Sequence, residues 1–228
     1  MKFSRQHIAT FLAILFHLSG LIGILVTPYK DWFIRNTPLN LCLMSLLLIW
    51  CQEDKKVSFF AFIVITYVTG MGAEMIGIST GNLFGEYSYG DVMGAKIKGV
   101  PWLIGINWFV VVYCSAAMMQ KFHDWFRKKI EETEAEMSPG IEGLSFIVDG
   151  ALLATFFDWV MEPVAMKLGF WQWKDGGIPV YNYTCWFIIS LLLLTLLRRM
   201  RFSKANHFAV HLLIIQILFF LALRTFLV

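Results

Sequence analysis

Residues 145–174 read SFIVDGALLATFFDWVMEPVAMKLGFWQWK, a long apolar run that carries acidic side chains. Such a run can cross the hydrocarbon core of a bilayer as a helix, which needs about 20 mostly apolar residues. Asp158 and Glu162 lie within it on one helix face, and Trp171 and Trp173 follow its end. Ionisable residues inside a membrane span are costly and usually functional. The stretch therefore predicts a membrane helix with a candidate site near one end.

The composition of the whole chain agrees with a membrane location. Of the 228 residues, 58% are hydrophobic and 15% are charged, whereas soluble proteins average about 45–50% apolar and about 25% charged residues. This composition excludes soluble, disordered, fibrous and secreted disulfide-rich classes. The formal net charge of +3 is too small to indicate a nucleic-acid partner. We expect a single integral membrane domain over residues 1–228.

Apolar segments recur along the chain and predict an all-α, polytopic membrane bundle of about seven transmembrane helices. The predicted spans are 8–27, 37–52, 57–78, 100–120, 143–165, 182–198 and 206–227. The second is short for a crossing. We interpret the first as a retained helix and not a signal peptide, because its apolar run is too long and no A-x-A cleavage site follows.

Basic residues indicate the orientation of this bundle. With a cytoplasmic N-terminus, the cytoplasmic segments carry 12 Lys and Arg residues and the outside segments carry 7, and cytoplasmic loops are the ones enriched in Lys and Arg. We therefore expect a multi-pass protein of the cell (inner) membrane with its N-terminus in the cytoplasm. Segment 121–142 would be a charged cytoplasmic connector, forming a short interfacial or soluble helix that ends at Pro139-Gly140.

Two loops, 77–101 and 167–183, are unusually rich in glycine and aromatic residues. Tyr87-Ser88-Tyr89 in the first aligns with Trp171-Gln172-Trp173 in the second. The aromatic residues have two interpretations: Trp and Tyr favour membrane interfaces in general, and two matching clusters on one side of the membrane also favour a shared pocket. We expect these to be two substrate loops.

The alignment of the two loops extends into the flanking segments. Trp108 and Trp186 each lie seven residues after an aligned proline, and an acid-bearing helix precedes each loop. Both copies run in the same direction. This order of helix, aromatic loop and helix predicts an internal parallel repeat with blocks at about 57–120 and 143–198.

Five polar side chains from four predicted spans fall at one depth, in the outer half of the bilayer: Glu74, Asn107, Asp158, Glu162 and Asn182. Two neighbouring carboxyl groups in a dry site cannot both ionise at low cost, so we expect one neutral acid next to one carboxylate base. Such a pair can protonate one group and deprotonate another. The alternative is structural, with the acids accepting hydrogen bonds that tie helices together.

The sequence contains no nucleotide-binding, dinucleotide-binding or nucleophile-elbow motif. His207 and His211 have a spacing that can hold a metal, but only Asp149 offers an acidic partner at a matching depth. We therefore expect neither a cofactor nor a metal. His17 is expected to be a packed, hydrogen-bonded histidine, and the scattered cysteines are expected to be buried apolar residues.

An aromatic, acid-bearing membrane pocket fits a lipophilic substrate that needs proton chemistry. A carboxylic acid can protonate a trisubstituted alkene, and Trp and Tyr faces stabilise the resulting tertiary carbocation. Capture of the cation by water gives a tertiary alcohol, whereas capture by an internal alkene gives a ring. Exclusion of water from all but one channel would decide between these outcomes.

The residues around the acids also form a pattern that covers about residues 70–190. It comprises Glu74-Met-Ile-Gly77, Thr80-Gly81, Phe84-Gly85-Glu86-Tyr87-Ser88-Tyr89, Gly99-Val100-Pro101, Trp108, Asp158-Trp-Val-Met-Glu162-Pro163-Val164-Ala165, Gly169, Trp171, Trp173, Gly177, Pro179, Asn182 and Trp186. This pattern resembles the carotenoid hydratases of the CruF type, often called carotenoid biosynthesis proteins. It departs from the family at Glu162-Pro163, where Asp-Pro is common, and this leaves the preferred end group open.

The resemblance implies hydration of the terminal double bond of an acyclic carotenoid ψ end, as in lycopene, γ-carotene or a C50 precursor, without a cofactor. It implies that Glu74, Asp158 and Glu162 transfer protons, with acid and base not assigned. The implied substrate-binding residues are Glu86, Tyr87, Tyr89, Asn107, Trp108, Trp171, Trp173, Asn182 and Trp186, among which the two asparagines orient water or a carboxylate. The implied partners are the carotenoid, water, the lipid bilayer and other enzymes of the carotenoid pathway.

Two other functions fit the same features. A membrane lycopene cyclase shares the protonation step and closes a ring in place of adding water. A proton-coupled transporter or a lipid-binding membrane protein also has repeats and acids within its spans. A water site next to the cation distinguishes the hydratase, and Asn107 and Asn182 are the candidates for it.

Overall fold

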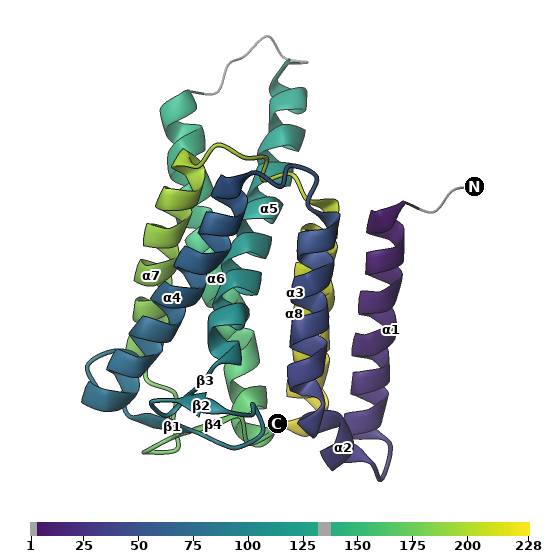
Figure 1. Ribbon diagram of the computed structural model, residues 1–228, viewed down its shortest axis with the longest axis vertical. Coiled ribbons are helices and arrows are strands. Elements are labelled where there is room, and N and C mark those ends of the chain that lie inside the picture. The colour runs from purple at the N-terminus through teal and green to yellow at the C-terminus, as the bar shows by residue number, and fades with distance from the viewer. Residues whose placement is uncertain (1–3, 132–137) are drawn as a thin grey trace.

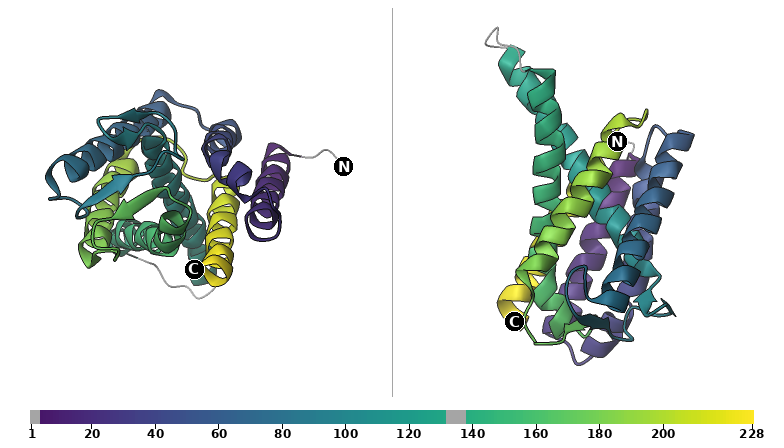
Figure 2. Two further views of the ribbon diagram at one scale, coloured as in Figure 1. Left: turned by 90° about the horizontal axis from the view of Figure 1, so that it is seen from below. Right: turned by 90° about the vertical axis from the view of Figure 1, so that its left-hand side faces the viewer.

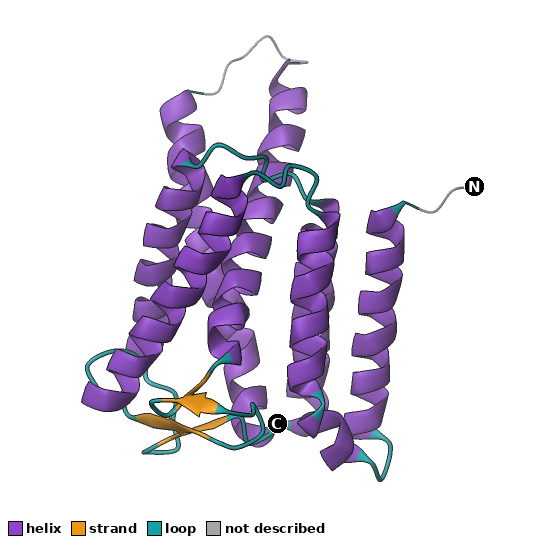
Figure 3. Ribbon diagram, viewed as in Figure 1, coloured by secondary structure: helices purple, strands orange, loops and turns teal. Residues whose placement is uncertain are grey.

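Helices make up most of this computed structural model, which describes residues 4–131 and 138–228, and short strands gather at one end of the bundle (Figure 3). The helices are α1 (Arg5–Leu25), α2 (Lys30–Arg35), α3 (Thr37–Cys51), α4 (Val57–Thr80), α5 (Leu103–Glu131), α6 (Pro139–Lys167), α7 (Val180–Arg199) and α8 (His207–Leu227) (Figure 1). The strands are β1 (Tyr87–Tyr89), β2 (Lys96–Ile97), β3 (Val100–Pro101) and β4 (Trp171–Trp173).

The prediction of an all-α, polytopic bundle is confirmed. Within the described residues, six helices are long and apolar enough to cross a membrane. The remaining apolar helix, α3, has 15 residues, in agreement with the short second span expected from the sequence. Helix α1 begins at the end of the bundle opposite to the end of α8, as an odd number of crossings requires (Figure 1). The short α2, in the turn between α1 and α3, was not predicted.

The predicted connector 121–142 differs from expectation. Its first residues continue α5, which runs to Glu131, so they do not form a separate helix. Pro139 begins α6 and does not end a helix. Proline suits the first turn of a helix because the N–H that it lacks would have no partner within the helix there. Residues 132–137 of this connector, like Lys2 of the charge count, lie outside the described residues.

The predicted repeat has a clear counterpart in the fold. Strand β1 pairs with β4 in antiparallel register, so Tyr87 is opposite Trp173 and Tyr89 is opposite Trp171. Between the blocks, the rings of Trp108 and Trp186 stack with centroids 3.8 Å apart and planes 9° apart. In a parallel repeat, α4–β1–α5 corresponds to α6–β4–α7, and an approximate two-fold axis along the bundle relates the two blocks. A two-fold rotation reverses the direction of a strand that lies across the axis. The two equivalent strands therefore pair antiparallel, as β1 and β4 do.

Backbone contacts hold the β1–β4 ladder at the end of the repeat. The Gly90 N–H donates to the carbonyl of Phe170 at 2.9 Å, and the Lys174 N–H donates to the carbonyl of Glu86 at 3.0 Å. A Cβ atom on Gly90 would lie 2.1 Å from the carbonyl oxygen of Gly169, so only glycine permits this approach. The ladder therefore closes one end of the α4–α7 repeat.

Helices α1, α3 and α8 lie together on one side of the repeat (Figure 2). Viewed from the strand end, the strands lie across the ends of α4 to α7 and leave α1 and α3 uncovered. Helix α1 packs mainly on α8, and α3 packs on α5. The bundle thus has two parts, the repeat and a three-helix side layer, and this division locates the cavities described below.

The packing of α4 on α5 gives a stability prediction with a matched control. A Cβ atom on Gly70 would lie 2.5 Å from Cγ of Trp108, whereas a Cβ on Gly72 would meet nothing within 4 Å. We expect Gly70→Ala to destabilise the fold by about 1–3 kcal/mol through overpacking. Gly72→Ala should leave stability unchanged or raise it, because alanine is the better helix former.

The measurement for this pair is the unfolding temperature of each purified variant in one detergent. Equal unfolding temperatures for Gly70→Ala and Gly72→Ala would contradict the close packing of α4 against Trp108.

Candidate active site

Glu74 is a buried carboxyl group on α4 that accepts hydrogen bonds from α5 and β1. Its Oε1 accepts from Nε1 of Trp108 at 3.1 Å. Its Oε2 accepts from the hydroxyls of Tyr89, at 2.8 Å, and Tyr87. Glu74 lies near the C-terminal end of α4, which ends at Thr80. Gly81 follows in the left-handed region of backbone conformation. Three donors from two other elements therefore fix this acid.

Glu162 is the corresponding buried carboxyl group of the second block, on α6. Its Oε2 accepts from the indole N–H groups of Trp171 at 2.9 Å and Trp173 at 3.0 Å. Its Oε1 lies 3.4 Å from Nδ2 of Asn182, which donates from α7. Each strand of the β1–β4 pair thus supplies two aromatic donors to the acid of its own block, which is the chemical basis of the aligned aromatic pairs.

The donors of the two blocks differ in chemistry. An indole N–H can only donate, whereas a phenol can donate and accept. Burial, and then the nearby charge of Glu74, raise the pKa of Tyr87 and of Tyr89. Both phenols therefore stay protonated and act as donors to Glu74 at neutral pH.

Asp158 has a different environment from the two glutamates. It is 0% exposed, and its Oδ2 accepts a single hydrogen bond, from Nδ2 of Asn182 at 2.8 Å. Its Oδ1 is buried without a hydrogen-bond partner among the described residues. Asn182 donates to both Asp158 and Glu162 and so links these two acids, which lie one helical turn apart on α6.

The acids surround a small hollow, which we name the acid chamber. Its volume is about 20 Å³, enough for one water molecule, which needs about 10–15 Å³ on this measure. Among its lining residues are Glu74, Tyr87, Tyr89, Asn107, Asp158, Glu162, Trp171, Trp173, Asn182 and Trp186. Polar groups on several sides give such a water hydrogen-bond partners.

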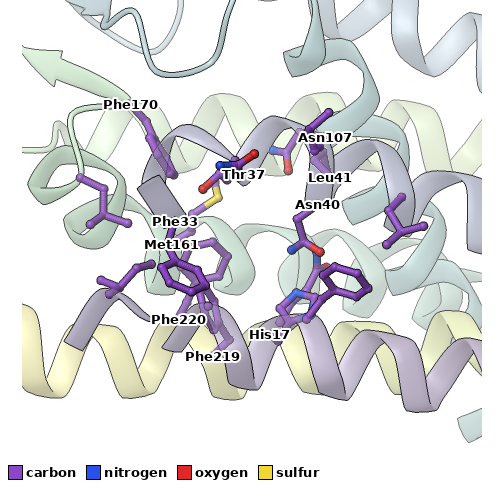
Figure 4. Close-up of a pocket in the computed structure, with 18 of the residues that line it drawn as sticks. His17, Phe33, Thr37, Asn40, Leu41, Asn107, Met161, Phe170, Phe219 and Phe220 are labelled. Carbon is purple, nitrogen blue, oxygen red and sulfur yellow. The ribbon is translucent and has the colours of Figure 1, made fainter. Parts of the chain in front are cut away.

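A larger hollow, the apolar cavity, lies between the repeat and the side layer (Figure 4). Its volume is about 630 Å³, within the range of about 300–1,000 Å³ that is typical of ligand sites. Ile104, Asn107, Met161 and Trp171 line both this cavity and the acid chamber, so the two are neighbours across one wall. Other parts of its lining come from α1, α2, α3 and α8.

The sequence-predicted residues do not all reach the acid chamber. Trp108 lies behind Glu74 as its donor and stacks on Trp186. Glu86, predicted to bind substrate, is exposed and pairs with Lys174. Successive side chains of an extended segment alternate between two faces, so Glu86 points away from the chamber that the next residue, Tyr87, lines.

Sequence reasoning also missed the apolar cavity. Its walls include Asn40 and Gln216, two polar residues within apolar helices, which is the signal that the sequence offered. His17 has the expected hydrogen bond, from its Nδ1 to the carbonyl of Ala13 at 2.8 Å, and it also lines the cavity. The described residues contain no group of three or more His, Cys, Asp or Glu side chains that could hold a metal ion.

Comparison with known proteins identifies the family of the chain. No curated protein and no solved structure is significantly similar to the chain. A family model described as "Carotenoid biosynthesis protein" matches residues 38–228. That range includes every residue of the acid chamber and most of the helices around the apolar cavity. The chain therefore belongs to the carotenoid biosynthesis protein family.

Proposed function

We propose that this protein is a carotenoid hydratase, which adds water across the terminal double bond of an acyclic ψ end to form a tertiary alcohol without a cofactor. The observation that carries the proposal is the site of Asp158, a buried acid with one hydrogen-bond donor next to a water-sized chamber. An acid, a base and a water site next to an apolar cavity are what this reaction requires.

Asp158 is the group that we assign as the proton donor. A buried carboxylate is stable only when hydrogen bonds replace its hydration. Glu162 has three donors, whereas Asp158 has one. When the two neighbours share a single negative charge, the charge therefore resides on Glu162 and the proton on Asp158. The unpartnered Oδ1 of Asp158 is the atom from which the proton can leave.

The remaining steps follow from the positions of the neighbouring groups. The alkene takes the proton of Asp158 at its less substituted carbon, and the positive charge develops on the tertiary carbon. The water in the acid chamber attacks that carbon, and the carboxylate of Glu162 takes the proton that the water loses. After the product leaves, the next water that enters the chamber can carry this proton from Glu162 back to Asp158, which restores the site. The sum is one alkene and one water consumed for each alcohol formed.

Aromatic faces and negative charge stabilise the carbocation in this scheme. Trp171 lines both the acid chamber and the apolar cavity, so it lies where an alkene that enters from the cavity would meet the acids. An indole ring attracts a cation placed over its face by about 0.5–2 kcal/mol. The hydrogen bond from Nε1 of Trp171 to Glu162 fixes the orientation of that ring.

The apolar cavity is where we place the end of the polyene. Phe16 on α1 and Leu39 on α3 line it, and their side chains are 45% and 67% exposed, so the cavity wall is not sealed there. A carotenoid dissolved in the bilayer can therefore enter sideways between α1 and α3, and its far end can remain in lipid. With the N-terminus in the cytoplasm, as the basic residues favour, the acid chamber lies near the outer face of the cell membrane.

The first test is the pigment made by variants in a bacterial host that accumulates lycopene. The wild-type chain should add the mass of one water for each modified end with an unchanged chromophore spectrum. Asp158→Asn should lower this hydration by about 10²–10⁴-fold, because it removes general acid catalysis. Glu162→Gln and Glu74→Gln should also lower it.

Asp149→Asn is the matched control for this assay, because Asp149 is an exposed acid on the same helix, α6. It should hydrate like the wild type at equal protein abundance. Unchanged pigments in all three acid variants would remove the catalytic assignment. A new pigment of unchanged mass with a shifted spectrum would identify a cyclase instead.

A second test separates the two roles of Trp171. Trp171→Phe keeps an aromatic face and loses the donor to Glu162, whereas Trp171→Leu loses both. We expect hydration to fall further in the leucine variant, with the extra loss about 2–30-fold, the rate equivalent of the cation–π energy. Trp159→Leu, on the exposed face of α6, should retain wild-type yield. Equal yields for Trp171→Phe and Trp171→Leu would exclude a role for the ring in stabilising the cation.

A further inference from the structure

Three polar side chains occur among the apolar residues of the apolar cavity, each from a different helix. His17 comes from α1, Asn40 from α3 and Gln216 from α8. His17 and Gln216 are only 6% and 7% exposed. Polar groups in such surroundings are normally hydrogen-bonded, because leaving one unpaired costs about 1–3 kcal/mol.

Each of the three side chains has hydrogen-bonding capacity that the described residues do not use. Asn40 Oδ1 and Gln216 Oε1 are buried and have no hydrogen-bond partner among the residues that the structure describes. His17 uses Nδ1 to donate to the carbonyl of Ala13, so in a neutral ring Nε2 is left as an acceptor. The cavity wall therefore holds at least three polar atoms available to a ligand.

The helix register places the three side chains together. Helices α1 and α3 run antiparallel, and Gln6 Nε2 donates to the carbonyl of Cys51 at 3.1 Å. Both helices rise by about 1.5 Å per residue, so counting from this contact puts Asn40 at the level of His17. Figure 4 shows these two side chains directed toward one another.

Gln216 joins the same cluster through the pairing of α1 with α8, which run in the same direction. The Oγ1 of Thr10 lies 2.9 Å from Nδ1 of His211, and the rings of His17 and Phe219 meet edge to face at 5.3 Å. Gln216 lies between the two α8 residues of these contacts and is less than one turn from Phe219. The cluster is therefore one polar site on an otherwise apolar wall.

We propose that His17, Asn40 and Gln216 form a hydroxyl-binding site in the apolar cavity, so that its ligand is a long isoprenoid carrying a hydroxyl group. A hydroxyl donates one hydrogen bond and accepts others, which matches a cluster made of two amides and an imidazole acceptor. A purely hydrocarbon ligand would leave these groups unpaired. The identification of the ligand as a carotenoid rests on the proposed function, whereas the presence of a hydroxyl group on it rests on this cluster alone.

The test compares ligands that differ only in the hydroxyl. Geranylgeraniol, its methyl ether and the hydrocarbon that lacks the oxygen would be added at equal mole fraction to the purified protein in nanodiscs. The rise in unfolding temperature reports binding. We expect the wild-type chain to bind the alcohol about tenfold more tightly than the hydrocarbon, the affinity equivalent of one or two hydrogen bonds.

Variants of similar size then remove the polar groups. Gln216→Met and Asn40→Leu should each reduce the preference for the alcohol and leave binding of the hydrocarbon unchanged or tighter. Ser190→Ala is the control, because Ser190 Oγ is another buried oxygen without a partner in the described residues and it does not line the cavity. It should keep the wild-type preference. Two substitutions on different helices keep the test available if one variant fails to fold.

Equal binding of alcohol and hydrocarbon by the wild type would overturn the proposal. A preference that persists in both Gln216→Met and Asn40→Leu would overturn it as well. The assay needs no turnover, so it is separable from the proposed function. Binding preference without pigment hydration would contradict only the hydratase, and hydration without binding preference would contradict only the hydroxyl site.

Discussion

Hydrogen bonding of buried carboxyl groups is the constraint on which the rest of this structure depends. Glu74 and Glu162 lie inside a membrane bundle, where no bulk water is present to solvate them. Each acid obtains two of its donors from a strand that crosses the end of the bundle, and a further donor from the helix that follows. The β1–β4 pair, the glycines that permit it and the helix ends beside it are arranged around this requirement.

The same constraint distinguishes Asp158 from the two glutamates. An acid with three donors is held in place, and its charge is stabilised. Asp158 is excluded from that arrangement, because Asn182 is its only donor among the described residues and its second oxygen has none. Ionisation of Asp158 is therefore unfavourable in this site. Among the three neighbouring carboxyl groups, the one with the fewest hydrogen-bond donors is thus the one that keeps its proton most firmly.

Much of the repeat was predictable from the sequence, because the features that define it are local. The spans follow from apolar runs, and the alignment of Tyr87 and Tyr89 with Trp171 and Trp173 follows from their period of two. What the sequence could not show is which group each aromatic side chain contacts. The division into two sets of donors, one for Glu74 and one for Glu162, depends on the antiparallel pairing of segments more than 80 residues apart.

The apolar cavity was not predictable for a related reason. Its walls combine the first three helices with α5, α6 and α8, and no motif links the first three helices to the others in the sequence. Asn40 and Gln216 were visible as polar residues in apolar spans, but only the antiparallel register of α1 and α3 and the parallel register of α1 and α8 bring them to one place. Glu86 is the opposite case: it belongs to the matching motif, yet its side chain is exposed and pairs with Lys174.

The length of α3 has a consequence for the membrane itself. Its 15 residues extend about 22 Å at the helical rise of about 1.5 Å per residue, whereas the hydrocarbon core of a bilayer is about 30 Å thick. A short span is accommodated by thinning of the surrounding lipid, by snorkelling of flanking side chains or by oligomerisation, each at a modest cost for each ångström of mismatch. Where thinning is the response, it falls on the side of the bundle where α1 and α3 line the apolar cavity. Long, rigid molecules that span the bilayer fit poorly in such a thinned region, so the mismatch favours their transfer from lipid into the protein.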